Sequence, residues 1–308
     1  MKVRIGIDIG GTNTKFGLIG PDGTILKRHR IQTSSFDSFD SFIKEVVEQA
    51  RKMLKSEDEL IGIGIGAPNG NVHSGMIESA PNMPWRYKLP IRAKVQEAFD
   101  CPVALTNDAN AAAMGEKIFG GAKEMNDFVV ITLGTGVGSG IYINGELAYG
   151  HDGFAGEIGH VITYPGGRLC GCGRRGCIEA YVNAKGILRT LAEEKYQFPD
   201  SELAQIEEKE INVKVIGQYA EKGDSLALHI FEKTGEFLGL TLANSMAYTS
   251  PEAFFLFGGI TKVGEILREP VHRHMEANML NIYQNKAKVV FSELPEDDAA
   301  ILGAAALV

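Results

Sequence analysis

The sequence has few cysteines and no long apolar run. Only four of its 308 residues are cysteine, and three of them crowd into positions 170 to 177, unlike the cysteine framework of a disulfide-stapled secreted domain. No segment approaches the roughly eighteen apolar residues of a membrane span. A secretory leader is also missing, because Met1–Asp8 runs directly into a strand pattern. We therefore expect a cytoplasmic protein with no membrane partner.

The sequence also has fewer basic residues than acidic residues. The chain has 31 Lys and Arg against 39 Asp and Glu, which gives a formal net charge of −8. This composition lacks the basic excess of a nucleic-acid-binding protein, so small molecules are the expected partners. Its 44% hydrophobic and 23% charged residues are ordinary for a globular protein, and its length favours two domains that share a cleft.

Strand and helix patterns alternate along the chain, which predicts an α/β fold. Apolar runs at Val3–Ile9 and Phe16–Ile19 flank one glycine-rich turn, and Phe128–Leu133 and Ile141–Ile143 flank a second turn at 134–140. This repetition indicates a duplicated architecture. Apolar spacing predicts helices at 38–55, 109–115, 226–248 and 299–308, and further strands at 61–66, 102–105 and 253–257.

The two glycine-rich turns are candidates for phosphate binding. Glycines allow backbone N–H groups to approach phosphate oxygens, hydroxyls add donors, and an acidic side chain at a strand end can hold Mg²⁺ through water. Each turn alone could equally be an ordinary hairpin, and neither fits the Walker or the dinucleotide pattern. Together they predict a two-loop clamp made of Asp8, Gly10, Gly11, Thr12, Asn13, Lys15, Gly134, Thr135, Gly136 and Gly138.

Three cysteines and one histidine form a candidate metal site. Cys170, Cys172 and Cys177 lie on a glycine-rich loop, and His160 precedes them by ten residues. A Cys₃His set composes the closed tetrahedral site typical of structural Zn²⁺, whereas a catalytic zinc would leave one position for water. The alternative is a group of reduced, unligated thiols. Cys101 stands apart and is predicted to be a core residue.

Several polar residues are candidates for binding or deprotonating a hydroxyl group. Asp108 follows Asn107 at a predicted strand-to-helix junction, where it could cap the helix or act as a general base. Glu157, His160 and Glu179 flank the cysteine loop and could accept hydrogen bonds from sugar hydroxyls. The alternative for these three is ordinary surface charge or support for the metal.

These motifs resemble the ROK family (repressors, open reading frames and kinases), especially its glucokinases, over essentially the whole chain. The most specific part is Glu157–His160 followed by the cysteine loop that ends at Glu179. The resemblance implies two ribonuclease H-like domains, as in actin and hexokinase, around a central cleft. We expect a smaller N-terminal domain of residues 1–118 plus 298–308 and a larger C-terminal domain of 119–297 that carries the zinc loop.

The resemblance also implies roles for individual residues. Asp108 matches the base that activates the sugar's 6-hydroxyl, and Asn107 and Asn82 match sugar ligands beside it. Ring hydroxyls would contact Glu157, His160 and Glu179, with His160 also binding Zn²⁺ through its other nitrogen. The glycine turns resemble the family's phosphate loops, and Gly258 and Gly259 resemble its segment near adenosine. One departure is Asn69, which stands where many members run directly from Pro to Gly.

The sequence thus predicts a homo-oligomeric kinase of carbohydrate metabolism and glycolysis that uses ATP, Mg²⁺ and structural Zn²⁺ to phosphorylate a hexose at its 6-hydroxyl. Glucose is the expected acceptor. N-acetylglucosamine, mannose, fructose and allose stay open as alternatives, because pocket shape decides among them. A less favoured alternative is a non-catalytic, sugar-sensing transcriptional regulator. A regulator would read DNA through a helix-turn-helix ahead of the first strand, and this sequence starts at that strand.

Overall fold

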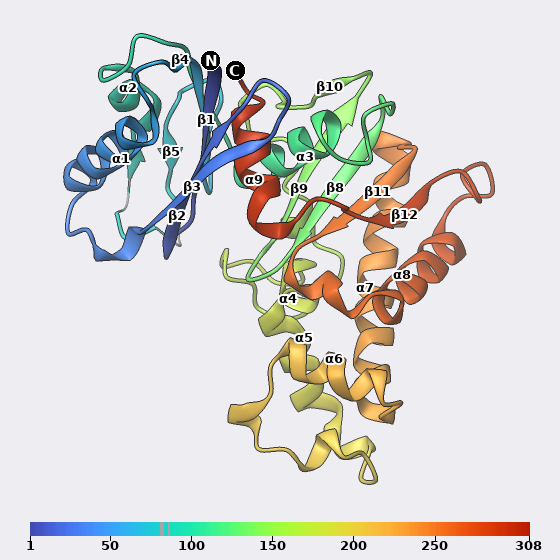
Figure 1. The fold of residues 1–308 in the computed structure, drawn as a ribbon. Coiled ribbons are helices and arrows are strands. Elements are labelled where there is room, and N and C mark those ends of the chain that lie inside the picture. Colours follow the sequence, from blue (N-terminus) through green and yellow to red (C-terminus); the bar gives the residue numbers. More distant parts are fainter. Residues whose placement is uncertain (81–82, 86) are drawn as a thin grey trace.

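The computed structural model describes residues 1–80, 83–85 and 87–308. Two five-stranded sheets form its two halves (Figure 1). In each sheet the first three strands are antiparallel and the last two are parallel additions, so the two sheets repeat one topology. The duplicated architecture and the α/β class predicted from the sequence are therefore confirmed.

The N-terminal sheet follows the order β3-β2-β1-β4-β7. Its strands are β1 (Lys2–Ile9), β2 (Asn13–Ile19), β3 (Ile25–Gln32), β4 (Glu59–Gly66) and β7 (Val103–Thr106). Helix α1 (Phe39–Met53) begins at Ser38, whose side chain accepts the Ser41 N–H, and buries its apolar stripe on this half. Smaller elements of the same half are α2 (Ile91–Gln96), β5 (Ile77–Glu78), β6 (Lys88–Leu89) and η1 (Thr33–Ser35).

The C-terminal sheet follows the order β10-β9-β8-β11-β12. Its strands are β8 (Phe128–Leu133), β9 (Val137–Ile143), β10 (Glu146–Leu147), β11 (Ala253–Phe257) and β12 (Lys288–Phe291). Strand β9 starts four residues earlier than the predicted Ile141, because the glycines at 138 and 140 take part in the ladder instead of the turn. The turn between β8 and β9 is correspondingly shorter than predicted.

Helices α7 and α8 pack against each other beside the C-terminal sheet, and α5 and α6 extend to the far end of the molecule (Figure 1). The longest, α7, ends where Ser250 adopts φ +41° just before Pro251. The helices of this half are α4 (Glu179–Val182), α5 (Ala184–Glu194), α6 (Val213–Glu221), α7 (Ser225–Thr249) and α8 (Glu265–Asn278). Its short 3₁₀ turns are η2 (Ile158–His160), η3 (Lys195–Gln197), η4 (Leu203–Gln205), η5 (Glu208–Glu210) and η6 (Gly259–Val263).

Two helices, α3 (Asp108–Ile118) and α9 (Glu296–Ala305), lie between the sheets (Figure 1). Helix α9 packs on β1 and β4, while α3 packs on β8 and β9. A Cβ on Gly64 of β4 would lie 1.7 Å from the Ala304 carbonyl oxygen, and one on Gly303 would lie 1.6 Å from the Ala111 carbonyl oxygen. Glycine at these two positions therefore allows the backbone of α9 to contact the backbone of β4 on one side and the backbone of α3 on the other.

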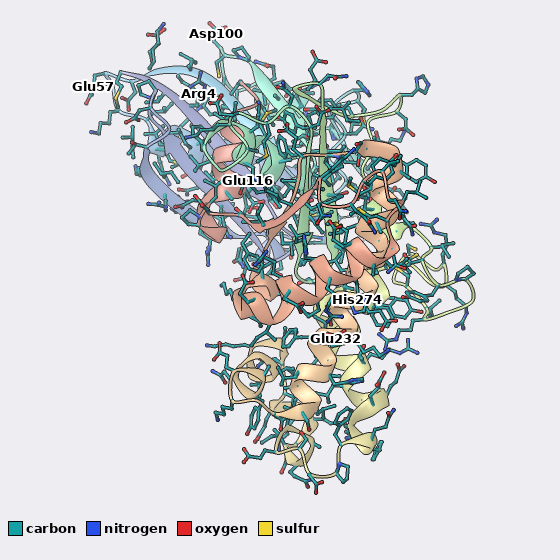
Figure 2. The ribbon with its side chains drawn as sticks, turned by 90° about the vertical axis from the view of Figure 1, so that its right-hand side faces the viewer. Arg4, Glu57, Asp100, Glu116, Glu232 and His274 are labelled. Carbon is teal, nitrogen blue, oxygen red and sulfur yellow. The ribbon has the colours of Figure 1, made fainter. Side chains whose placement is uncertain are left out.

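Glu116 ties this central layer to the C-terminal segment. The residue is 1% exposed, lies on α3 (Figure 2), and accepts hydrogen bonds from the Gly121 N–H and the Ser292 hydroxyl. Burial raises the pKa of its carboxyl group, and the bond from Ser292 opposes that rise. The chain thus crosses between the halves beside a buried carboxylate. The domain boundaries themselves stay a prediction.

The described residues contain no helix that is both long and apolar enough to cross a membrane. Cys101 is buried in the core of the N-terminal half, as the sequence predicted.

Candidate active site

Three parallel strands of the N-terminal sheet end at one edge. Asp8 of β1 pairs with Gly66 of β4, and Gly66 pairs with Thr106 of β7. The segments that follow are the turn at 10–12, the loop at 67–71 and the junction at Asn107 and Asp108. Because the carboxyl ends of parallel strands share an edge, the sheet places these three segments together, as in other open α/β sheets.

Asn107, not Asp108, caps helix α3. The Asn107 Oδ1 accepts the Asn110 N–H at 2.6 Å, while Asp108 is the first helical residue. The capping alternative for Asp108 is therefore wrong. Asp108 is exposed as a whole residue, and its Oδ1 accepts the Ala109 N–H at 2.9 Å. Surrounding protein nevertheless displaces enough hydration to raise the pKa of Asp108, against the opposing effect of that backbone bond.

Glu157, Glu179 and His160 come from the C-terminal half and lie within electrostatic reach of one another. Burial is the main cause that raises the pKa of Glu157; His160 lowers it, and the negative charges of Asp108 and Glu179 raise it further. The charge of Asp108, from the N-terminal half, thus acts on Glu157 in the other half. Glu157 therefore lies within electrostatic range of three other residues that the sequence assigned to the sugar.

Glu179 also contacts the glycine turn between β8 and β9. Its Oε2 accepts the Val137 N–H at 3.0 Å, and a Cβ on Gly136 would lie 2.9 Å from that oxygen. No atom lies within 4 Å of the Cβ position of Gly134, so the described surroundings leave that side of the turn open. At Gly138 a Cβ would lie 2.9 Å from Ala109, so this glycine also serves the packing of β9 on α3.

The other residues predicted to bind the nucleotide lie at the edges of two different sheets. Gly258 has φ +111° and packs against the Leu133 carbonyl, so Gly258 and Gly259 lie beside the turn that follows β8. The first turn lies on the other sheet, where the Gly10 N–H donates to the Asn13 carbonyl at 2.9 Å. Of its remaining residues, Gly11 and Thr12 continue the turn and Lys15 pairs opposite Asp8 in β2. Of the glycines in the two segments, Gly138 at the start of β9 is the one that packs against the start of α3.

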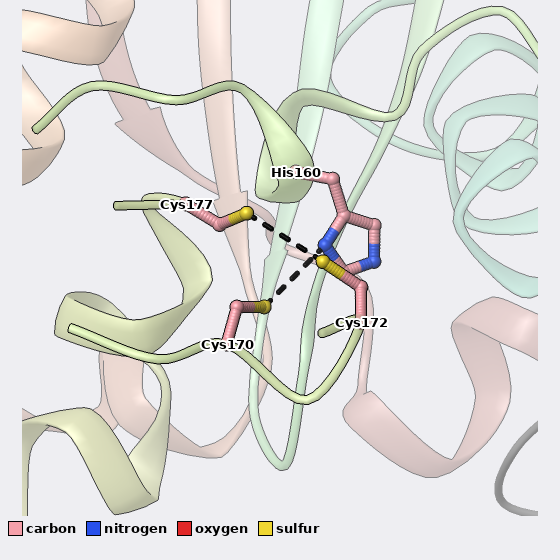
Figure 3. A group of neighbouring side chains, drawn as sticks. All are labelled: His160, Cys170, Cys172 and Cys177. Atoms are coloured by element: carbon pink, nitrogen blue, oxygen red, sulfur yellow. Dashed lines mark hydrogen bonds between the residues drawn. The ribbon is translucent and has the colours of Figure 1, made fainter. Parts of the chain in front are cut away.

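The four predicted metal ligands converge. The ligand atoms of His160, Cys170, Cys172 and Cys177 all lie within 4.8 Å of one another (Figure 3). The Cys170 Sγ is 3.7 Å from the His160 Nδ1, and the Cys172 Sγ is 3.6 Å from the Cys177 Sγ. These thiols are free, and their separation is much longer than the roughly 2 Å of a disulfide.

The donor set and its spacing fit Zn²⁺. Sulfurs about 2.3 Å from one tetrahedral zinc ion lie about 3.8 Å apart, and a sulfur and an imidazole nitrogen lie about 3.5 Å apart. The observed separations match both values. Because Nδ1 faces the thiols, Nε2 is the nitrogen of His160 that the candidate metal ligand set does not use.

Arg168 anchors the cysteine loop to the helices behind it, a role that the sequence analysis missed. Its guanidinium is 8% exposed, donates to the Gly186 carbonyl at 3.0 Å, and lies 4.7 Å from the centre of the Tyr181 ring. It also pairs with Glu193 at 2.6 Å. A buried arginine with this many partners fixes the start of the loop. Its only signal in the sequence was its place just before Cys170.

The segment around the remaining sugar candidates is partly described. Asn82 lies outside the described residues, so its prediction has no outcome here. Trp85 packs against Phe42, with ring centres 4.9 Å apart. Asn69 adopts φ +51°, a conformation that favours glycine or asparagine, and its Nδ2 donates to the Glu78 carbonyl at 2.9 Å. Asn69 therefore supports its own loop with this amide group.

A separate hollow of about 430 Å³ lies between α7 and α8, away from these residues. Its lining includes Glu232, which pairs with Arg273 at 2.6 Å and with His274 at 2.7 Å (Figure 2). Glu265 and Glu269 on the same wall pair with arginines of α8. Because these charges are already neutralised by protein partners, the hollow offers no comparable chemistry.

Comparison with known proteins agrees with this geometry. The model of the ROK family matches residues 4–308. A glucokinase of Halalkalibacterium halodurans is 35% identical over 312 residues, which cover 99% of this chain and 94% of the relative. A xylose repressor of Bacillus spizizenii is 30% identical over 307 residues, which cover 99% of this chain and 76% of the repressor.

Solved structures show the same relationship. The ROK family glucokinase from Streptomyces griseus, in complex with glucose and AMPPNP, is 31% identical with a TM-score of 0.83, and the match covers 99% of both chains. The two repeated sheets are thus the two halves of an actin- and hexokinase-like ATPase fold, as predicted. The chain belongs to the ROK family.

Proposed function

We infer that this protein is an ATP-dependent hexose kinase that converts glucose to glucose 6-phosphate. The observation that carries this inference is that Glu157 of one half lies within electrostatic range of Asp108 of the other half and of His160 and Glu179. The full-length relationship to glucokinases, one of them solved with glucose and AMPPNP, supports glucose as the acceptor and ATP as the donor.

In the proposed mechanism Asp108 is the general base. A base for a sugar hydroxyl must be ionised but must still attract a proton as the hydroxyl attacks phosphorus. The raised pKa of Asp108 serves the second need, and its access to solvent leaves room for the hydroxyl. Asp108 would accept the proton of the 6-hydroxyl while that oxygen bonds to the γ-phosphorus of ATP and ADP leaves.

The remaining polar groups would hold and orient the two substrates. Glu157, Glu179 and the His160 Nε2 would bind ring hydroxyls, with Asn107 and Asn82 beside Asp108. The turns at 10–13 and 134–138 would offer N–H groups to the phosphates, with Lys15 nearby and Gly258 and Gly259 near adenosine. Asp8 would hold Mg²⁺ through water, and that ion would neutralise charge on the transferred phosphoryl group.

We propose that His160, Cys170, Cys172 and Cys177 hold a structural Zn²⁺. The Cys₃His set fills all four positions with protein atoms, so the ion would order the loop rather than take part in the chemistry. Its effect on the reaction would come through His160, whose ring orientation it fixes, and through Glu179 at the end of the loop.

We further propose a cytoplasmic homo-oligomer that acts in glycolysis, with residues 1–118 plus 298–308 and 119–297 as its two domains. A non-catalytic sugar-sensing regulator is the second candidate, because xylose repressors match over nearly the whole of this chain. N-acetylglucosamine, mannose, fructose and allose are the alternative acceptors.

Sugar-dependent release of ADP from MgATP tests the proposal. We would rank glucose, mannose, fructose, allose and N-acetylglucosamine by kcat/KM, in protein whose zinc content has been measured. We expect glucose to rank first. A different first sugar would keep the kinase and change the acceptor, whereas binding of sugar without any turnover would support the regulator instead.

A further inference from the structure

A short hairpin after β4 projects from the N-terminal half and carries Asn71 at its base. Within this hairpin the Asn71 N–H donates to the Met76 carbonyl, and the Gly75 N–H donates to the Asn71 carbonyl, both at 2.9 Å. Arg92 of α2 supports it from behind by donating to the Val72 carbonyl at 3.0 Å. The hairpin is therefore anchored to the N-terminal half on both sides.

The loop at 148–156 belongs to the other half and leads directly into Glu157. The Ala148 N–H donates to the Ile141 carbonyl of β9 at 2.8 Å, and the Ser139 hydroxyl donates to the Gly156 carbonyl. Both ends of the loop are thus attached to the C-terminal sheet. Because the loop leads directly into Glu157, the position of the loop determines the position of Glu157.

The side chain of Asn71 joins these two segments. It is 3% exposed, and its Nδ2 donates to the Asp152 carbonyl at 2.7 Å. Its Oδ1 accepts the N–H groups of His73 and Ser74 within the hairpin at 2.9 and 3.1 Å. One amide therefore closes its own hairpin with its oxygen and reaches across to the other half with its nitrogen.

Two neighbouring features reinforce this contact. Gly153 has φ +85°, and a Cβ there would lie 2.8 Å from the Asn71 Oδ1, so the loop backbone is pressed against the amide. The His73 Nε2 lies 3.3 Å from the Gly150 carbonyl oxygen. The hairpin and the loop thus meet at two successive places.

We propose that Asn71 is a positioning residue for sugar binding, which sets the place of Glu157 relative to Asp108. Asn71 follows β4 at the edge where β7 leads into Asp108, and its partner Asp152 precedes Glu157 by five residues. The contact therefore spans the two halves beside the carboxylates that would grip the hexose. This inference rests on the function proposed above and adds to it a residue that touches neither substrate.

The substitution Asn71→Asp removes the hydrogen bond between the halves but keeps the hydrogen bonds of the local turn. The aspartate keeps an oxygen that can accept from His73 and Ser74, but it replaces the donor to Asp152 with a second, negatively charged acceptor. Two acceptors facing each other in a buried place repel, so the hairpin would persist while its link to the loop opens. Asn212→Asp is the matched control, because exposed Asn212 caps α6 through its Oδ1 alone.

The test compares the three proteins by Tm, by glucose Kd without nucleotide, and by KM for glucose and for ATP. The single tryptophan, Trp85, supplies a fluorescence signal for the glucose titration. For Asn71→Asp we expect glucose Kd and KM to rise on the order of tenfold, with the KM for ATP within about twofold and kcat reduced less than glucose affinity. Asn212→Asp should match the wild type in all four.

An unchanged glucose Kd in Asn71→Asp would overturn the proposal. Equal losses for glucose and ATP together with a lowered Tm would also overturn it, because they would show a general structural role. Wild-type protein that binds glucose but releases no ADP would contradict the kinase assignment alone, since the comparison of glucose Kd would still decide the role of Asn71.

Discussion

Asn107 and Asp108 are adjacent residues with separate tasks at the start of α3. Asn107 satisfies a free N–H of the first helical turn, so the carboxylate of Asp108 is not needed for capping. The sequence alone could not divide these tasks, because both residue types cap helices well. Their backbone conformations determine which residue caps the helix, because Asn107 is extended and Asp108 is already helical.

The raised pKa of Asp108 predicts an acid limb in the pH dependence of kcat/KM for glucose. The base acts only when ionised, so activity is present above its pKa and is lost as the pH falls through it. Because the surrounding protein displaces hydration and raises this pKa above its ordinary value of 3.8, activity should be lost at a higher pH than an unperturbed aspartate would give. Steady-state kinetics across the pH range in which the protein stays folded measures the limb.

Glu157→Gln is the companion experiment for this pH profile. The charge of Asp108 raises the pKa of Glu157, and like-charge repulsion is mutual, so removal of the Glu157 charge should move the acid limb to lower pH even though glucose binding weakens. A limb that stays in place, or that moves to higher pH, would show that Asp108 is not the group being titrated.

At the scale of elements, the cysteine loop with its candidate metal ligands was the part of the site that the sequence predicted best. Its four ligands lie within eighteen residues, so their types and spacing could be read locally. The contact of Asn71 with Asp152 joins residues 81 positions apart and left no such signal. The same applies to Arg168, whose partners on α5 are known only once the loop has folded onto that helix.

Strand limits followed the apolar runs closely, except that β2 begins at Asn13 instead of Phe16 and β9 begins at Val137 instead of Ile141. The glycines at 138 and 140 indicated a longer turn, yet both lie inside β9. They are needed there because α3 crosses that strand so closely that a Cβ on Gly140 would lie 2.5 Å from the Ala113 side chain. Glycine in a strand can mark close packing as well as a turn, and the sequence does not separate the two meanings.

Removal of zinc should disorder residues 160–179 and weaken glucose binding before it affects ATP. The ion would hold His160 and the loop that ends at Glu179, whereas Gly258 and Gly259 lie on a separate segment. Calorimetric titration of glucose and of a non-hydrolysable ATP analogue, before and after chelation and again after zinc is restored, measures both affinities. Unchanged glucose affinity in protein verified to be free of metal would refute this role.

At the scale of the whole molecule, two copies of one sheet topology face each other across α3 and α9 (Figure 1). The repeated strand-turn-strand pattern in the sequence predicted this duplication. The pattern could not predict how closely the halves approach, because the approach depends on the close packing of β9 on α3 at Gly138 and Gly140. The proposed mechanism requires that approach, since its base comes from one half and the other proposed sugar ligands come mainly from the other.

Turnover and glucose binding in Asp108→Asn test the central claim most directly. Asparagine keeps the size and polarity of the side chain but cannot take a proton at neutral pH. We predict that kcat for glucose phosphorylation falls roughly 10²- to 10⁴-fold while glucose Kd changes by less than about threefold. Turnover close to that of the wild type in this variant would contradict the assignment of Asp108 as the base and, with it, the mechanism proposed for this kinase.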